Sequence, residues 1–406
     1  MSLTTRIFIA LVVGLALGAA FASAKPDGLL AVADLAGTLW LNALRMTIVP
    51  LVFAMLVTSA AAAAATAAAG GLAARTLATF LALLLASAAF GAVMMEALLA
   101  WVPISPESVA AIRGGLGEAG GSQPTLVPIG EWLASLVPSN PLRSAVEDAM
   151  VPLVVFALLF GFAASRIVEE SRQRLVGFFQ AMADAMLVLV HWVLLVGPLG
   201  IFALAFALGV RVGLGAAGAL VHYVLLIVVI CVLLTLSVYL FVLGARLDLK
   251  AFARAALTGQ VVAFSTQSSL AALPAMVEGA QQHLKVPPRV TGLVLPLAVS
   301  LFRYTSPAAN LGIAIYLASF HGIDLGWPQL AAGVGVAAVV SLGAVSLPGQ
   351  ITFFTSCVPI CLALGVPLDA LPLLLAVEAI PDMFRTVGNV TADVGVTAFA
   401  GRRERS

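Results

Sequence analysis

The sequence predicts an all-α, polytopic membrane protein, and three observations lead to that fold class. Of the 406 residues, 62% are hydrophobic and only 10% carry a charge, whereas about 25% of the residues in a soluble domain are charged. The mean hydropathy is +1.12. The apolar residues fall in runs of about 20 residues or more, which is the length that crosses a bilayer as a helix. A formal net charge of +1 argues against a nucleic-acid partner, because phosphate binding requires a surplus of basic side chains.

Eight apolar runs are candidates for membrane spans. They cover residues 5–24, 34–62, 76–101, 146–165, 180–210, 214–244, 291–320 and 366–400. We interpret the first run as a retained helix, because it lacks a convincing signal-peptide cleavage site and further spans follow it. The polar insertion at 102–127 is rich in Gly, Ser and Pro and predicts an extracellular loop. Residues 401–406 predict a cytoplasmic tail.

The lysines and arginines predict the orientation, because cytoplasmic loops retain basic residues. Most of them lie on one side if both termini are cytoplasmic and two segments, 255–280 and 325–364, do not cross. Each segment contains a polar interruption, from Ser265 to Ser269 in the first and from Ser346 to Gln350 in the second. Broken helices at membrane depth are typical of transporter binding sites, so we expect two re-entrant helical hairpins. Two proline-kinked helices are the alternative.

The last apolar run carries a stripe of polar side chains. At 100° per residue, six of them fall within one face that is about 100° wide. They are Glu378, Asp382, Arg385, Thr386, Asn389 and Asp393. An ionisable residue costs about 2.5–3.5 kcal/mol in a membrane helix, so this cluster predicts a functional site that faces the protein interior. An ion-pair zipper that only holds helices together is the alternative.

The chemistry of the stripe suits an amino acid ligand. Asp382 can bind an ammonium group, Asn389 an α-carboxylate, and Arg385 a second carboxylate in bidentate fashion. An intramembrane aspartyl protease also uses two aspartates, but Asp382 and Asp393 lie about three helical turns apart, too far to share a proton. The four histidines are scattered, and no nucleophile and base share a face. We therefore predict a protein that is not an enzyme and has no cofactor.

Several motifs resemble those of one family. Residues 381–393, Pro-Asp-Met-Phe-Arg-Thr-Val-Gly-Asn-Val-Thr-Ala-Asp, resemble the DMxRTxxNVTGD signature of the dicarboxylate/amino acid:cation symporters, the family of glutamate and aspartate transporters. The stretch from Ser265 to Pro274 is similar to the serine-rich tip of that family's first hairpin. Further matches lie at residues 46–53, 137–141 and 341–349. The resemblance runs nearly end to end.

The resemblance implies a glutamate-transporter-like fold with eight transmembrane helices and two re-entrant helical hairpins. It also implies a homotrimer in the cell (inner) membrane. Residues 1–70 and 128–210 would form a trimerisation scaffold. Residues 71–101 and 211–400 would form a transport domain that moves like an elevator.

The resemblance also implies a set of site residues. Asp382 would bind the substrate amino group and Arg385 its side-chain carboxylate. The other substrate-binding positions would be Thr386, Asn389, Ser268, Ser269 and Ser306, with a gate at Ser346, Pro348 and Gly349. Because both Asp382 and Arg385 are present, aspartate or glutamate is favoured as the substrate.

One motif departs from the family pattern. The family's seventh helix carries NMDGT, whose Asn and Asp bind sodium, whereas this chain has Phe302-Arg303-Tyr304-Thr305-Ser306. Two sodium ligands are lost, and we expect Arg303 to take the place of a mobile cation. Pairing of Arg303 with an acidic residue for stability alone is the alternative. The coupling residues would be Arg303, Tyr304, Glu378, Asn389 and Asp393, and any residual sodium would bind at Asn389, Asp393, Ser300 and Ser341.

These observations predict a transporter of an acidic amino acid in which sodium coupling is weakened or lost and a proton is the coupling ion. Glu378 is the candidate proton carrier, because burial disfavours a charged carboxylate. The expected partners are a small-molecule substrate and membrane lipid. The alternatives are a transporter of four-carbon dicarboxylates or of another amino acid, and an anion channel or binding-only homologue.

Overall fold

The computed structural model describes residues 3–22, 27–68, 71–105, 134, 136–147, 149–212, 215–343 and 349–403. Within these ranges the secondary structure is helical and contains no strand. The predicted all-α class is therefore confirmed for this part of the chain. Most of the predicted extracellular loop at 102–127 lies outside the described residues.

The helices follow one another along the chain with short connections. They are α1 (Leu3–Phe21), α2 (Asp27–Ala68), α3 (Gly71–Trp101), α6 (Pro141–Val146), α7 (Met150–Ala164), α8 (Glu169–Leu195), α9 (Gly197–Val212), α10 (Gly215–Gly244), α11 (Leu249–Thr266), α12 (Ser269–Gln282), α13 (Pro288–Leu301), α14 (Ser306–His321), α15 (Trp327–Gly343), α16 (Gly349–Ala363), α17 (Leu371–Val377) and α18 (Ala379–Arg403). Each predicted apolar run coincides with one helix or with a consecutive pair.

Three predicted runs are interrupted in the structure, namely 180–210, 291–320 and 366–400. Pro198 follows the junction of α8 and α9, where its missing N–H cannot continue the hydrogen-bond ladder. Phe302 is extended, with φ −116° and ψ 96°, and ends α13. Glu378 separates α17 from α18, although its carbonyl still accepts a hydrogen bond from the N–H of Asp382 at 2.9 Å. Reading each run as one uninterrupted helix was wrong.

Four helices in the described part of the chain, α2, α3, α8 and α10, are long and apolar enough to cross a membrane. Helices α1, α7, α9, α15 and α16 are apolar but shorter. The interruptions described above shorten the helices of the C-terminal half. The count of eight spans and two re-entrant hairpins is finer than these lengths resolve and stays a prediction.

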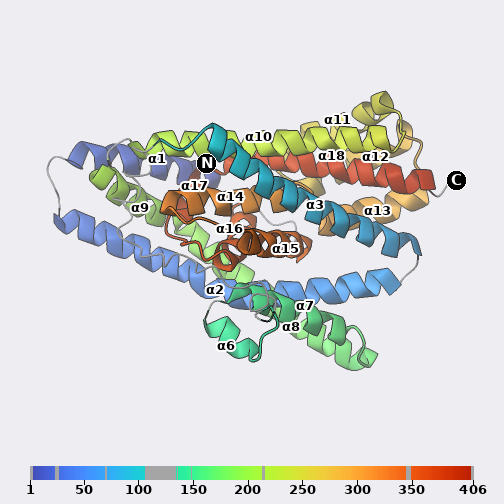
Figure 1. The fold of residues 1–406 in the computed structure, drawn as a ribbon, viewed down its shortest axis with the longest axis horizontal. Coiled ribbons are helices and arrows are strands. Elements are labelled where there is room, and N and C mark those ends of the chain that lie inside the picture. Colours follow the sequence, from blue (N-terminus) through green and yellow to red (C-terminus); the bar gives the residue numbers. More distant parts are fainter. Residues whose placement is uncertain are drawn as a thin grey trace.

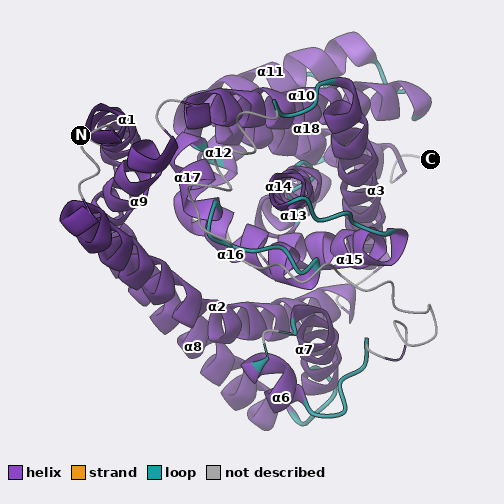
Figure 2. Ribbon diagram, turned by 60° about the vertical axis from the view of Figure 1, so that its left-hand side comes forward, coloured by secondary structure: helices purple, strands orange, loops and turns teal. Residues whose placement is uncertain are grey.

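The helices pack in two groups. In the first, α1 lies beside α9, and the long α2 contacts α7, α8 and α9. In the second, α10 to α18 gather together with α3, and α18 lies alongside α10 and α11 (Figure 1). Figure 2 shows the first group as an arc beside the second. The division into a scaffold and a transport domain at 1–70, 128–210, 71–101 and 211–400 stays a prediction.

Helices α11 and α12 form an antiparallel hairpin. Gly279 packs on the backbone of Ala255, and the hydroxyl of Thr258 lies 3.5 Å from the carbonyl of Ala275. At the tip, Gln267 adopts a left-handed conformation with φ 54°. The side chain of Ser268 accepts a hydrogen bond from the N–H of Ala271 at 3.2 Å and so caps α12. The polar interruption predicted in this segment is therefore a turn between two helices.

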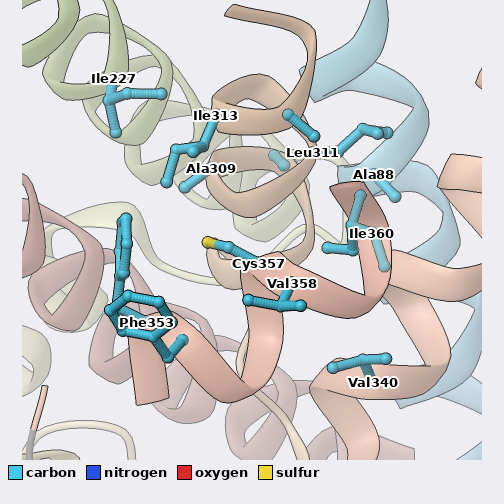
Figure 3. Packing of buried hydrophobic residues seen from close by; sticks show 14 of the residues in the cluster. Ala88, Ile227, Ala309, Leu311, Ile313, Val340, Phe353, Cys357, Val358 and Ile360 are labelled. Atoms are coloured by element: carbon cyan, nitrogen blue, oxygen red, sulfur yellow. The ribbon is translucent and has the colours of Figure 1, made fainter. Parts of the chain in front are cut away.

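Helices α15 and α16 pack against each other and against α14. The side chain of Cys357 in α16 points toward α14, near Ala309 and Ile313 (Figure 3). Its thiol lies 3.6 Å from the side-chain oxygen of Asn310. The connection between α15 and α16, which includes the predicted gate residues Ser346 and Pro348, lies outside the described residues.

Small residues allow α3 and α14 to approach closely. A Cβ added at Gly91 would lie 2.4 Å from the Cα of Ala308 and 2.6 Å from its carbonyl oxygen. Close approach at small residues is a principal source of helix association in membranes, where no hydrophobic effect drives the helices together.

We therefore predict that Gly91→Ala destabilises the protein by about 1–3 kcal/mol, because overpacking displaces one helix from the other. The measurement is the apparent Tm of the detergent-solubilised protein. Gly335→Ala in α15 is the matched control, because a Cβ there meets nothing within 4 Å. An unchanged Tm for Gly91→Ala would contradict this account of the contact.

Candidate functional site

The polar stripe of α18 is enclosed by protein. Helices α10, α11, α12 and α13 all pack against α18. As a result, none of the six stripe residues is more than 9% exposed; these residues are Glu378, Asp382, Arg385, Thr386, Asn389 and Asp393. Charged groups at this depth require opposite charges or hydrogen bonds around them.

Arg385 lies between two carboxylates. Its Nη2 atom forms an ion pair with Oε1 of Glu378, and its Nη1 atom lies 3.6 Å from Oδ1 of Asp382. The Nε atom of Arg385 has no hydrogen-bond partner among the described residues. The guanidinium can therefore accept a further anionic group, and a second carboxylate that binds it in bidentate fashion competes with Glu378.

Glu378 has a second partner that the sequence did not indicate. The hydroxyl of Tyr223, in α10, donates a hydrogen bond to Oε2 of Glu378 at 2.5 Å. Tyr223 is fully buried. Both carboxylate oxygens of Glu378 are thus bound by side chains from α10 and α18. Tyr223 lies within a long apolar run, so no local pattern distinguishes it.

Asn389 holds the interruption between α13 and α14 against α18. Its Oδ1 atom accepts a hydrogen bond from the N–H of Thr305 at 2.8 Å. The hydroxyl of Thr305 lies 2.7 Å from the carbonyl of Arg385 and 2.8 Å from Oδ1 of Asn389. A Cβ added at Gly388 would lie 2.3 Å from Cγ2 of Thr305, so only glycine allows this approach. The sequence did not predict this role for Thr305.

The residues that replace the NMDGT motif lie on both sides of this interruption. Phe302 stacks on Phe80 of α3, with ring centroids 4.5 Å apart. The carbonyl of Tyr304 accepts a hydrogen bond from Ser87 at 2.5 Å, and its hydroxyl lies 2.9 Å from that of Ser237. These contacts fix the backbone on either side of Arg303.

Arg303 itself is half-buried and lies close enough to Asp382 and Asp393 to interact with both electrostatically. Arg385 lies near enough to oppose it. The sequence suggested pairing with Glu378 or Asp393. In the structure Arg303 faces Asp393 and Asp382, whereas Glu378 is bound to Arg385 and Tyr223.

Asp393 is fully buried, and neither carboxylate oxygen is hydrogen-bonded to any described residue. Among the other candidate sodium ligands, Ser341 is buried with an unpartnered hydroxyl in the described part of the chain. Ser300 is exposed and donates to the carbonyl of Pro296 at 2.8 Å, and Oδ1 of Asn389 is bound to Thr305. Oxygen atoms of Asp393 and Ser341 are therefore the ones left to accept a cation or a donor.

The first hairpin tip touches the start of α18. The side-chain amide of Gln267 lies 3.4 Å from the carbonyl of Ala379, and Ser268 and Ser269 are half-buried. Thr386 uses its hydroxyl within α18, donating to the carbonyl of Asp382 at 2.7 Å. Ser306 is buried, and its hydroxyl has no partner among the described residues. Gly349 begins α16.

Comparison with known proteins adds one decisive observation. The model of the sodium:dicarboxylate symporter family matches residues 3–402 of the chain. The chain belongs to this family. Together with its long apolar helices, membership makes it a multi-pass membrane protein. The resemblance read from the motifs is confirmed.

Three relatives illustrate the range of the family. The proton/glutamate-aspartate symporter of Escherichia coli (strain K12) is 27% identical over 400 residues, which cover 97% of this chain and 90% of the relative. The proton/sodium-glutamate symport protein of Bacillus subtilis (strain 168) is 29% identical over 278 residues, 65% of this chain and 61% of the relative. Excitatory amino acid transporter 1 of Bos taurus is 28% identical over 315 residues, 75% of this chain and 56% of the relative.

The contacts of Thr305 predict a loss of stability on Thr305→Val. Valine keeps the volume but removes the hydroxyl, which leaves the carbonyl of Arg385 without this donor at a cost of about 1–3 kcal/mol. The apparent Tm in detergent should fall. The control is Thr47→Val in α2, a buried threonine whose hydroxyl donates only to the carbonyl of Leu44 in its own helix. Equal Tm values for the two variants would contradict this role of Thr305.

Proposed function

We propose that the protein is a secondary active transporter of an acidic amino acid, aspartate or glutamate, and that a proton is its main coupling ion. The observation that carries the proposal is the buried arrangement of Arg385 between Glu378 and Asp382. Membership of the sodium:dicarboxylate symporter family supports it. So do the printed names of the relatives, which describe glutamate and aspartate symport.

The substrate would bind across one face of α18. Asp382 would bind the ammonium group, Arg385 the side-chain carboxylate, and Asn389 with Thr386 the remaining polar atoms. Ser268, Ser269 and Ser306 would contribute from the first hairpin tip and from the start of α14. Both charges of Asp382 and Arg385 are needed for an acidic amino acid, because a bidentate carboxylate partner and an ammonium partner recognise its two ends.

Proton coupling follows from competition for Arg385. When a substrate carboxylate binds the guanidinium, Glu378 loses its ion pair while it stays buried. An unpaired carboxylate in such surroundings is costly and takes up a proton instead. Binding of substrate and binding of a proton therefore favour each other, which is the thermodynamic condition for symport.

The charge of the site supports the same conclusion. Three carboxylates, those of Glu378, Asp382 and Asp393, face two guanidiniums, those of Arg303 and Arg385. An acidic substrate adds another negative charge, and a buried excess of this kind requires neutralisation. Arg303 supplies one fixed positive charge in the segment where the family pattern has sodium ligands, so fewer mobile cations are needed.

The larger mechanism is part of the proposal. A homotrimer in the inner membrane, with cytoplasmic termini, would hold the helices of the first group as a scaffold. The second group would carry the substrate across as an elevator. The packing of the helices into these two groups supports this division.

Uptake by purified protein in proteoliposomes tests the function. With labelled aspartate outside, an inward proton gradient without sodium should drive accumulation, and an inward sodium gradient at equal pH should drive little. Competition by glutamate, succinate and neutral amino acids defines the substrate class. Strict dependence on sodium would overturn proton coupling, and the absence of any concentrative uptake would overturn the transporter assignment.

Arg303→Met separates a functional from a structural role of that arginine. Methionine fills a similar volume but leaves Asp393 without the fixed charge, so we expect transport either to fall at least tenfold or to become dependent on added sodium. The measurement is uptake with and without sodium at constant pH. Arg174→Met is the control, because Arg174 is exposed and pairs only with Glu170 on its own helix. Kinetics equal to those of the control would assign Arg303 to stability alone.

A further inference from the structure

A proton that is carried by Glu378 must reach a side chain that is only 2% exposed. The groups that face Glu378 are Arg385 and Asp382 from α18, Tyr223 and Cys231 from α10, and Cys357 from α16. Of these, Tyr223 is the group that donates a hydrogen bond to Oε2. A phenol hydroxyl is both donor and acceptor, so Tyr223 can bind Glu378 as a carboxylate and as a carboxylic acid.

Tyr223 packs against a second buried tyrosine. The ring of Tyr316, in α14, lies 5.5 Å from that of Tyr223, centroid to centroid, and the ring planes are inclined by 53°. Tyr316 is also fully buried. Its hydroxyl donates to the carbonyl of Ala219 at 2.8 Å and lies 3.1 Å from Nδ1 of His222. The two phenols therefore connect the surroundings of Glu378 to a histidine.

His222 is half-buried, and its Nε2 atom lies 2.9 Å from the carbonyl of Val102, just beyond the end of α3. A carbonyl only accepts, so Nε2 must carry a hydrogen. If Nδ1 does not, it must accept the hydrogen of Tyr316, and the carbonyl of Ala219 then loses its donor. If Nδ1 also carries a hydrogen, it donates to Tyr316, which donates to Ala219, and every contact is satisfied.

The hydrogen bonds around Tyr316 thus have two arrangements that differ by one proton on His222. Histidine is the side chain that gains and loses a proton most readily in the physiological range. It lies at the outer end of the series, where the chain leaves α3, and Glu378 lies at the inner end.

We propose that His222, Tyr316 and Tyr223 form a proton relay between the end of α3 and Glu378. The inference rests on the proton-coupled transport proposed above and names the route for its proton. Doubly protonated His222 gives its Nδ1 proton to the oxygen of Tyr316. Tyr316 passes its own proton toward Tyr223, and Tyr223 passes its proton to Oε2 of Glu378. The imidazole ends neutral, both phenols end unchanged, and the carboxylate becomes a carboxylic acid.

One step in the relay requires rearrangement. The hydroxyls of Tyr223 and Tyr316 are not hydrogen-bonded to each other in the described structure, so a water molecule or a rotated hydroxyl must join them. We expect this transfer to be the slowest one. Either phenol is therefore a position at which a small change slows proton access without altering the residues that bind substrate.

The test uses full-length protein in proteoliposomes and two measurements. The first is aspartate uptake driven by an inward proton gradient, with proton influx followed by a trapped pH-sensitive dye. The second is exchange of labelled for unlabelled aspartate at equal pH, which requires substrate binding but no net proton movement. The variants are Tyr316→Phe and His222→Gln. Glutamine keeps a donor and an acceptor but cannot carry the proton. Tyr239→Phe is the control, because Tyr239 lies in the same helix and its hydroxyl accepts from Gln260 outside this series.

We expect both variants to slow proton-driven uptake and dye acidification at least tenfold, while exchange stays within twofold of wild type and the control behaves as wild type. Glu378→Gln should show the same separation. Uptake in both variants equal to the control would overturn the relay and leave the proposed function intact. Parallel loss of exchange and uptake in both variants would also overturn it, because the residues would then be structural. Wild-type protein without proton-driven uptake would overturn the proposed function itself.

Discussion

The buried guanidinium of Arg385 is the constraint on which the site depends. A charge removed from water is tolerated only where opposite charges and hydrogen bonds replace the solvent. Asp382 and Glu378 supply the carboxylates, and their spacing along the chain brings both to the face of α18 that carries Arg385. Removal of any one of the three leaves an uncompensated charge in the interior. The energetic balance of the group is therefore shared, and a ligand that changes one pairing changes the others.

The same helix also organises the broken segment between α13 and α14. Backbone groups in an interrupted helix need partners at membrane depth, and α18 supplies them through Asn389 and the carbonyl of Arg385. Glycine at position 388 allows Thr305 to come that close. The segment that holds Arg303 is thus fixed by the neighbours of Arg385. The two arginines are positioned by one set of contacts, which couples the cation region to the substrate region.

The sequence predicted the features that repeat with helical spacing. The buried stripe from Glu378 to Asp393 follows from a 3.6-residue period, and the polar tip at Ser268 follows from an interrupted apolar run. The sequence did not predict Tyr223 or Thr305 as partners of the stripe, because their contacts join helices far apart in the chain and their local surroundings are typical apolar helix. It also did not predict the break at Phe302, since an apolar residue that ends a helix leaves no signal in hydropathy.

A fixed arginine and a mobile cation have different consequences for energy coupling. A sodium ion that binds on one side of the membrane and leaves on the other contributes its gradient to the cycle. Arg303 neutralises part of the same negative charge but stays with the protein, so it lowers the cost of burial without contributing any driving force. The driving force must then come from a group that changes its charge during the cycle. Glu378 meets this requirement, because its partner Arg385 is the group that an acidic substrate would occupy. Replacement of sodium ligands by Arg303 and proton uptake by Glu378 are therefore two parts of one change in coupling.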